Sequence, residues 1–211
     1  MTIGTSGHDT AHKSHEHINA LRAVQAEQER RRRWWIRAAS LGATVAVIGV
    51  VVAMMLTSRQ ESSAATRVAP DFTLTDTSGT TVSLAALRGK DVLLYFSEGA
   101  GCQACLVQMA QIEKDPNIAA AGLTVLPIVM NSKEQITADM AANGVRTPFL
   151  LDDGTVSTAY GTIGKGMHEG LPGHSFVLID KTGNQRWYGE YPSMYLSTTD
   201  LLKQIRAHLT D

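Results

Sequence analysis

The two cysteines of the chain, Cys102 and Cys105, are the residues best suited to chemistry. They lie three positions apart, after the apolar run Val92–Phe96 and before a stretch of helical composition at residues 106–112. A helix start favours a thiolate, because its unpaired N–H groups and positive dipole end lie beside the sulfur. Two cysteines this close enclose too small a loop to stabilise a domain, so we interpret them as reactive. We expect Cys102 to be the nucleophile and Cys105 the resolving thiol.

The immediate neighbours of the pair leave its reduction potential open. Gln103 and Ala104 carry no charge, and Glu98 would oppose a thiolate if its side chain points inward. A cysteine-rich zinc site is excluded, because the chain has no further cysteine. We expect no bound cofactor, since a redox-active disulfide itself carries the electrons.

A membrane-length apolar segment precedes the cysteines at residues 38–56, which contain no charged side chain. As a helix it would be about 28 Å long, close to the thickness of a bilayer's hydrocarbon core. Trp34 and Trp35 suit the interface, and the arginines at 30–33 predict a cytoplasmic N-terminus. We therefore predict a single-pass protein of the cell membrane whose redox domain lies outside the cytoplasm, where disulfides form.

A cleaved signal peptide is the alternative explanation of this segment, with a small-residue site at 63–65. The stretch before the apolar core exceeds thirty residues, and the core is longer than the usual 7–15, so we favour an anchor.

The charge of the chain is asymmetric. Residues 1–69 carry nine Lys and Arg against five Asp and Glu, whereas residues 70–211 carry ten against fifteen. A basic cluster can indicate nucleic-acid binding. Here it adjoins the membrane-length segment, so topology explains it better and no nucleic-acid partner is expected.

Composition predicts four regions in the chain. They are a cytoplasmic, Arg-rich and partly disordered tail (1–33), a transmembrane helix (34–57), a linker (58–69) and a redox domain (70–211). The tail contains His8, His12, His15 and His17. Clustered histidines can bind metal, but polar tails of this composition are more often disordered.

Short strands alternate with helices from residue 70 onward, which is the pattern of βαβ units. The expected elements are a hairpin (71–76, 81–84), a strand (91–96), the cysteine helix, a strand (123–130), a helix (132–143), a strand (147–152), a short helix (155–160), a second hairpin (175–180, 185–190) and a final helix (201–209). Ser132 is expected to cap the helix at 132–143, and Gly144 to end it. Pro127 suits an edge or a bulge. The pattern predicts an α/β domain with a central mixed sheet flanked by helices.

Residues 70–211 resemble the membrane-tethered thioredoxin-like proteins of the TlpA/ResA and alkyl-hydroperoxide-reductase/thiol-specific-antioxidant (redoxin) superfamily. The motifs that carry the resemblance are residues 69–74, 82–90, the cysteine pair and 176–183. The resemblance implies a thioredoxin-like fold and a thiol–disulfide oxidoreductase. Its partners would be disulfides or thiols of extracytoplasmic proteins, or a redox partner protein.

An antioxidant peroxidase of the same superfamily is the first alternative. The threonine or serine found three residues before a peroxidatic cysteine would fall at Gly99, and the proline seven before it at Tyr95. Both differ from the usual peroxiredoxin pattern.

The glycine-rich loop at 161–173 leads to the residues that should face the thiols. Pro172 lies one or two residues early for the cis-proline of thioredoxins, which leaves Gly173 or His174 opposite the cysteines. His174 could be a surface or loop histidine, a neighbour that stabilises the Cys102 thiolate, or a copper ligand. In the last case the protein would resemble the Sco-type copper chaperones, with copper held by Cys102, Cys105 and His174, although those proteins use Cys-x-x-x-Cys.

Overall fold

The computed structural model describes residues 30–32, 34–37, 39–52, 61–64, 66–164 and 169–209. The chain divides into two compact units, Met1–Ser58 and Arg59–Asp211. The tail and its four histidines, for which metal binding was one hypothesis, lie outside the described residues.

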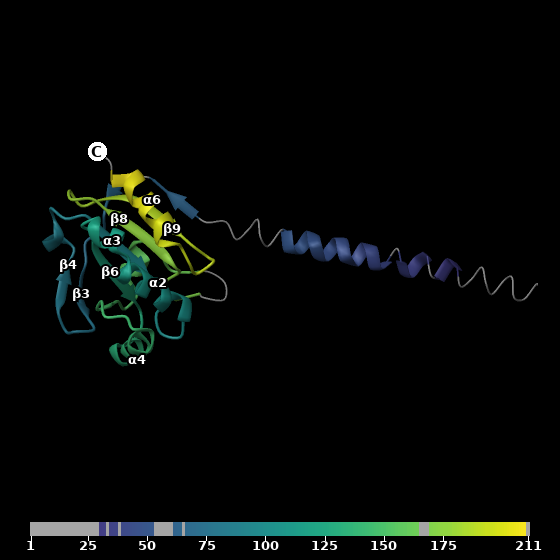
Figure 1. Cartoon of the computed structure of the whole chain (residues 1–211), viewed down its shortest axis with the longest axis horizontal. Helices are drawn as coiled ribbons and strands as arrows, with labels where there is room; N and C mark the ends of the chain where they lie inside the picture. The colour runs from purple at the N-terminus through teal and green to yellow at the C-terminus, as the bar shows by residue number, and fades with distance from the viewer. Residues whose placement is uncertain are drawn as a thin grey trace, which may run out of the picture. The chain divides into compact units, whose positions relative to one another are not determined.

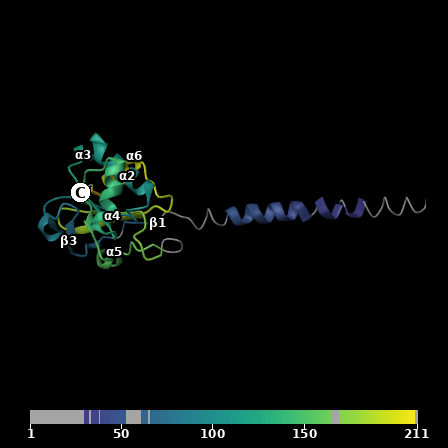
Figure 2. The ribbon, with the colours of Figure 1, turned by 90° about the horizontal axis from the view of Figure 1, so that it is seen from below.

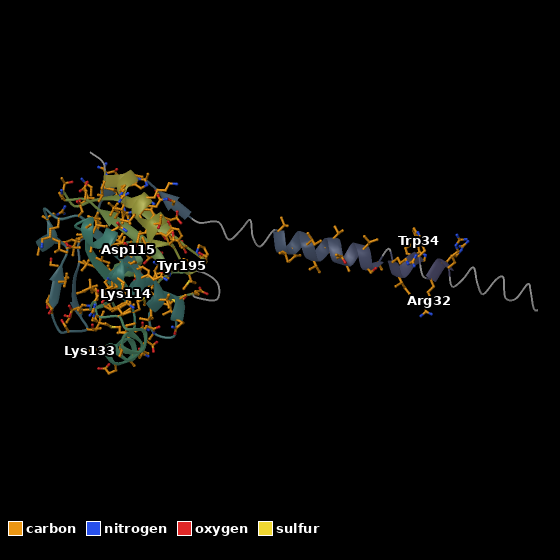
Figure 3. The ribbon with its side chains drawn as sticks, viewed as in Figure 1. Arg32, Trp34, Lys114, Asp115, Lys133 and Tyr195 are labelled. Atoms are coloured by element: carbon orange, nitrogen blue, oxygen red, sulfur yellow. A yellow bond between two sulfur atoms is a disulfide. The ribbon has the colours of Figure 1, made fainter. Side chains whose placement is uncertain are left out.

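The first unit contains one helix, Arg30–Val52, that is long and apolar enough to cross a membrane. It has 23 residues, its most apolar 18-residue window has a mean hydropathy of 1.9, and none of that window is buried inside the protein. Arg32 and Trp34 project from its first turns (Figure 3). The helix overlaps the predicted span, of which residues 53–57 lie outside the described part of the chain. Its orientation in a membrane stays a prediction.

The second unit is built on one mixed sheet with the strand order β1-β9-β8-β5-β6-β7-β3-β4, in which β2 also pairs with β9 (Figure 1). The pairs β5–β6 and β6–β7 are parallel, and the others are antiparallel. The strands are β1 (Glu61–Ser63), β2 (Arg67–Val68), β3 (Thr73–Asp76), β4 (Thr81–Ser83), β5 (Val92–Phe96), β6 (Thr124–Val129), β7 (Leu150–Leu151), β8 (Ser175–Ile179) and β9 (Asn184–Glu190). The predicted fold class is confirmed.

Helices cover both faces of this sheet. They are η1 (Ala85–Leu87, a 3₁₀ turn), α2 (Gln103–Lys114), α3 (Pro116–Ala120), α4 (Lys133–Asn143), α5 (Thr155–Ala159) and α6 (Thr198–Leu209). Figure 2 shows α2, α3 and α6 on one side of the sheet and α5 on the other. The bounds of α4 follow the predicted signals, since Ser132 forms a capping box and Gly144 ends the helix in the left-handed conformation.

Strand β5 is the centre of the sheet and leads directly to the cysteines. All five of its residues are buried, as expected for a strand between two partners and covered on both faces. Leu93 and Tyr95 belong to the core cluster under α2, α4 and α6, whereas Leu94 and Phe96 belong to the cluster on the other face. This alternation fixes the end of β5 in a rigid core. It therefore also fixes the start of residues 97–103, the cysteine loop, which carries Cys102 to the beginning of α2.

The stretch expected to be a linker contains the two short strands β1 and β2. Both pair antiparallel with β9, and Ser62 Oγ accepts a hydrogen bond from Trp187 Nε1 at 3.0 Å. These strands have three and two residues, which is too short for an alternation pattern to be visible in the sequence. They form because β9 would otherwise leave its amides unpaired at the edge of the sheet.

Pro127 lies in β6, which is an internal strand and not an edge of the sheet as one prediction had it. It is opposite Tyr95 of β5, while β7 pairs only with Ile128 and Val129. At Pro127 the strand therefore has a partner on one side only. Proline, which has no N–H to donate, is tolerated there because one side of the backbone has no partner strand, as at the edge of a sheet.

Glu113 ties the last turn of α2 to the segment before β7. Its carboxylate accepts hydrogen bonds from the backbone N–H groups of Arg146 at 2.9 Å and Thr147 at 3.1 Å, and from both side chains. Burial raises the pKa of Glu113, but these hydrogen bonds outweigh it and lower the pKa from 4.5 to about 2.

We expect Glu113→Gln to lower the free energy of unfolding at pH 7 by about 3 kcal/mol at most, the value of that pKa difference. A depressed carboxyl pKa stabilises the fold above pH 4.5, and this stability is lost as the pH falls towards 2. Denaturant unfolding at pH 7 and pH 3 measures both effects. A difference between variant and wild type that is as large at pH 3 as at pH 7 would contradict the assignment.

Candidate redox site

Cys102 and Cys105 form a disulfide at the N-terminus of α2, with their Cα atoms 5.3 Å apart. Cys102 is the N-cap residue of the helix, and its sulfur lies 3.3 Å from the backbone nitrogen of Cys105. Cys102 is partly exposed, whereas Cys105 is 1% exposed. The difference in exposure supports Cys102 as the sulfur that meets substrate.

Helix α4 holds the cysteine loop through two side chains one turn apart. Asp139 Oδ2 accepts a hydrogen bond from the N–H of Gly101 at 2.8 Å, and Asn143 Oδ1 accepts one from Gln103 Nε2 at 2.5 Å. Residues four apart lie on the same face of a helix, so α4 presents both groups to the loop together.

Gly99 lies where the loop passes closest to β6. Its φ is +72°, and a Cβ atom built there would lie 2.1 Å from Asn131 Oδ1 and 2.7 Å from Val129 Cγ1. Asn131 Oδ1 is itself held by the N–H of Ala100 at 2.8 Å. Position 99 therefore requires glycine, and the hydroxyl residue of a peroxidatic motif does not fit.

A buried aromatic pair lies beneath the disulfide. The Tyr95 hydroxyl is 3.1 Å from the carbonyl oxygen of Cys105 and 3.2 Å from Nδ1 of His174. The Tyr95 ring also stacks on Phe176, with the centroids 4.9 Å apart. Burial raises the pKa of Tyr95 above its ordinary value, so the hydroxyl stays protonated. The Tyr95 hydroxyl therefore donates a hydrogen bond to the backbone carbonyl of Cys105.

His174 is 1% exposed, so the interpretation as a surface histidine is wrong. Because the Tyr95 hydroxyl donates to Cys105, His174 can join the chain by donating from Nδ1, which leaves Nε2 as an acceptor. That Nε2 is buried and has no hydrogen-bond partner among the residues that the structure describes. Burial lowers the pKa of His174 to about 4, so the imidazole is neutral at pH 7 and supplies no positive charge to a thiolate.

The other two residues expected near the thiols are held by the loop itself. Pro172 is buried and forms a bridge with Ile163, and the N–H of Gly173 donates to the carbonyl of Thr162 at 2.7 Å. Every peptide bond in the described residues is trans, so Pro172 does not reproduce the cis-proline of thioredoxins. Of the three predicted neighbours, His174 is the one that hydrogen bonds connect to the cysteines within the described part of the chain, through Tyr95.

The residues do not fit a copper site in this form of the protein. Both sulfurs are in the disulfide, and within the described part of the chain no three His, Cys, Asp or Glu side chains form a group that could hold a metal ion. Soft thiolates are what would attract copper, and neither is present here.

A scan of known families gives a match over more than half of the chain. The model of the AhpC/TSA family matches residues 65–188. The chain belongs to the AhpC/TSA family.

Several relatives support this membership. A Mycobacterium tuberculosis protein assigned as a peroxiredoxin is 36% identical over 99 residues, which are 46% of this chain and 63% of that protein. Chloroplastic peroxiredoxin Q of Triticum aestivum is 32% identical over 123 residues, covering 55% of this chain and 54% of that one. The chain thus spans less than two thirds of the length of these relatives.

Solved structures agree on the fold. A Bacteroides thetaiotaomicron protein assigned as a protein disulfide isomerase is 29% identical with a TM-score of 0.54, over 69% of this chain and 89% of that one. A cysteine-to-serine mutant of Xylella fastidiosa PrxQ has a TM-score of 0.58 at 17% identity, over 70% of this chain and all of that one. The AhpC/TSA domain therefore has a thioredoxin-like fold.

Four site residues were not singled out from the sequence. Tyr95 looked like one more residue of an apolar strand. Asn131, Asp139 and Asn143 lie 31, 38 and 40 positions along the chain from the residues they hold. They reach the loop only because the end of β6 and helix α4 return to it. A polar residue directly after a buried strand was the one available signal, at Asn131.

The buried His174 predicts acid sensitivity in the AhpC/TSA domain. A histidine whose pKa is lower in the fold than in the unfolded chain binds its proton first in the unfolded chain. Stability is therefore lost as the pH falls from 6.5 towards 4. We expect the free energy of unfolding to fall by about 2 kcal/mol between pH 7 and pH 5 from this residue. His174→Gln should flatten that slope, as measured by denaturant unfolding.

Tyr95→Phe is the matched control, because it removes the hydroxyl but leaves His174 buried. It should keep the slope between pH 7 and pH 5. An unchanged slope in His174→Gln would show that the acid sensitivity has another source.

Proposed function

We propose that the protein is a thiol–disulfide oxidoreductase whose reacting groups are Cys102 and Cys105. The observation that carries the proposal is the disulfide between the only two cysteines of the chain, at a helix N-terminus, with one sulfur reachable and the other buried. Thiol–disulfide exchange needs both kinds of sulfur, one to meet the substrate and one to resolve the mixed disulfide.

In the reducing direction, the Cys102 thiolate attacks a substrate disulfide, forms a mixed disulfide and releases the first substrate thiolate. Cys105 then attacks the Cys102 sulfur, which re-forms the Cys102–Cys105 bond and releases the second substrate thiolate. Two electrons pass to the substrate, and the two protons of the cysteine thiols end on the released thiolates. The Tyr95 hydroxyl holds the Cys105 carbonyl at 3.1 Å and so fixes the backbone that positions the resolving sulfur.

A relative supports this chemistry. The Bacteroides protein assigned as a disulfide isomerase has the highest sequence identity among the structural neighbours described above, at 29%. Disulfide isomerisation uses the same exchange steps between protein thiols and disulfides.

Peroxide reduction is the second candidate function. The relatives from Mycobacterium and wheat, at 36% and 32% identity, are assigned as peroxiredoxins. In that reaction the Cys102 thiolate would attack the hydroperoxide, break its O–O bond, release the alcohol (or water) and become a sulfenic acid. Cys105 would convert this sulfenic acid to the disulfide with release of water. Gly99 stands where the usual hydroxyl residue would be, which is why we place this function second.

The proposed partners are disulfides or thiols of extracytoplasmic proteins, or a redox partner protein. They follow from the proposed topology, in which Arg30–Val52 spans the membrane with the N-terminus in the cytoplasm. No bound cofactor is required.

A direct test compares two activities of the full chain in detergent. Insulin-disulfide reduction with a dithiol donor is expected at a rate well above the donor alone, and hydroperoxide consumption is expected to be slow. Fast hydroperoxide turnover without insulin reduction would instead establish the peroxidase. Stoichiometric Cu(I) binding by the reduced protein, lost in His174→Ala, would establish metal binding in place of both.

The reduction potential of the couple measures the direction of electron flow. A value near that of thioredoxin, about −270 mV, indicates a reductant, and one near that of DsbA, about −120 mV, indicates an oxidant.

A further inference from the structure

Within the described ranges of the chain, three polar side chains from outside the loop that carries Cys102 hydrogen bond to it, and one of the three is charged. They come from the end of β6 and from α4: Asn131, Asp139 and Asn143. Asp139 contacts the N–H of Gly101 at 2.8 Å, whereas the other two groups are neutral amides. A neutral amide oxygen can accept such a hydrogen bond, as Asn131 does, so the negative charge of Asp139 is not needed for the contact itself.

The carboxylate of Asp139 lies at the same helix end as the reacting sulfur. Gly101 directly precedes Cys102, the N-cap of α2, so standard bond lengths place the Asp139 carboxylate within about 10 Å of the Cys102 sulfur. Two negative groups at this separation repel each other, and the partly exposed site weakens the repulsion without removing it. A thiolate at Cys102 is thus opposed by a fixed negative neighbour.

No positive side chain compensates within the loop. Residues 99–105 contain no Lys or Arg, and Glu98, just before them, is a second carboxylate. His174 is buried beneath the disulfide beside Tyr95 and is neutral at pH 7. On α4, Lys133 and Glu134 stand in the first turn with opposite charges, more than one turn from Asp139.

We propose that Asp139 sets the direction of the exchange, by disfavouring the Cys102 thiolate and so making the reduced cysteine pair a donor of electrons. The inference rests on the proposed thiol–disulfide exchange. The reduced pair gives two electrons to a substrate disulfide, whose thiolates take up the two thiol protons, and it becomes the Cys102–Cys105 disulfide. A dithiol of a redox partner protein then restores the reduced pair. Asp139 acts through the loop and the electric field, as a positioning residue that does not touch substrate.

The variant Asp139→Asn separates charge from structure, because its amide oxygen can still accept the hydrogen bond from Gly101. We expect the equilibrium constant with glutathione to shift three- to tenfold towards the dithiol, tenfold corresponding to about 30 mV for a two-electron couple. The thiolate fraction of Cys102 at pH 7, read from absorbance at 240 nm, should rise in the same variant.

Two further variants make the test specific. Glu134→Gln removes a carboxylate from the same helix, away from the loop, and should leave the equilibrium constant unchanged. Asn143→Asp adds a carboxylate on the face that holds Gln103 and should shift the constant towards the disulfide.

The proposal is overturned if Asp139→Asn stays within twofold of wild type, or if Glu134→Gln shifts the constant equally. A purely structural role would lower the unfolding midpoint of Asp139→Asn and leave the constant in place. Insulin reduction by the wild-type chain is measured in parallel. Its absence would remove the proposed function, whereas its presence with an unmoved constant removes only the role of Asp139.

Discussion

Replacing Cys102 by serine should reduce insulin-disulfide turnover to the rate of the dithiol donor alone. The hydroxyl of serine is not ionised at neutral pH and cannot form a mixed disulfide, so the first step of the exchange is lost. Because Cys102 is partly exposed at the N-cap of α2, the substitution leaves the core intact. Turnover is measured from insulin precipitation, and the fold from circular dichroism.

Cys105→Ser is the matched control for this experiment. It keeps the attacking thiol but removes the resolving one, so mixed disulfides with substrate should accumulate and be visible on non-reducing gels. Wild-type turnover in Cys102→Ser would reject the assignment of the two sulfurs. Trapping of mixed disulfides by Cys102→Ser in place of Cys105→Ser would reverse it.

The second large effect is expected from Gly99→Ala, which should destabilise the domain by about 2–4 kcal/mol. Part of this is the cost of a side chain at φ +72°. The larger part is steric, because the new methyl group would lie 2.7 Å from Val129 Cγ1 and displace Asn131 from the N–H of Ala100. Displacement of the loop should also slow the exchange reaction. Denaturant unfolding and insulin turnover measure the two consequences.

Gly101→Ala isolates the backbone contribution. Gly101 has φ +87°, but a Cβ there would meet no atom within 4 Å. We therefore expect this variant to be destabilised only by the strain of a side chain in the left-handed conformation, about 1–2 kcal/mol. Equal losses in the two variants would show that the contacts with Val129 and Asn131 do not carry the effect.

The elements that depend on local signals could be predicted from the sequence. The strand before the cysteines, the helix after them and the cap at Ser132 were predicted because burial, helix composition and capping chemistry act within a few residues. The spacing of the two cysteines likewise predicted a pair at the start of a helix, where the structure joins them in a disulfide.

Long-range packing decided what the sequence did not reveal. The contacts of Asn131 and Asp139 with the loop join residues 31 and 38 positions apart, and no periodicity records such a pairing. The burial of His174 depends on how Tyr95 and Phe176 pack around it. The sequence showed a histidine near the right place, but its depth in the protein decides its protonation and hence its role.

The pairing of β1 and β2 with β9 decides where a soluble recombinant fragment can begin. A fragment starting at Pro70 would follow the predicted domain boundary, yet it would strip both strands from β9 and leave the buried Trp187 without the Ser62 hydroxyl. An uncovered edge strand of seven residues can pair with the same strand of another molecule, so such a fragment should aggregate when it is concentrated. A fragment starting at Arg59, the first residue of the second unit, retains the covering strands and should remain monodisperse.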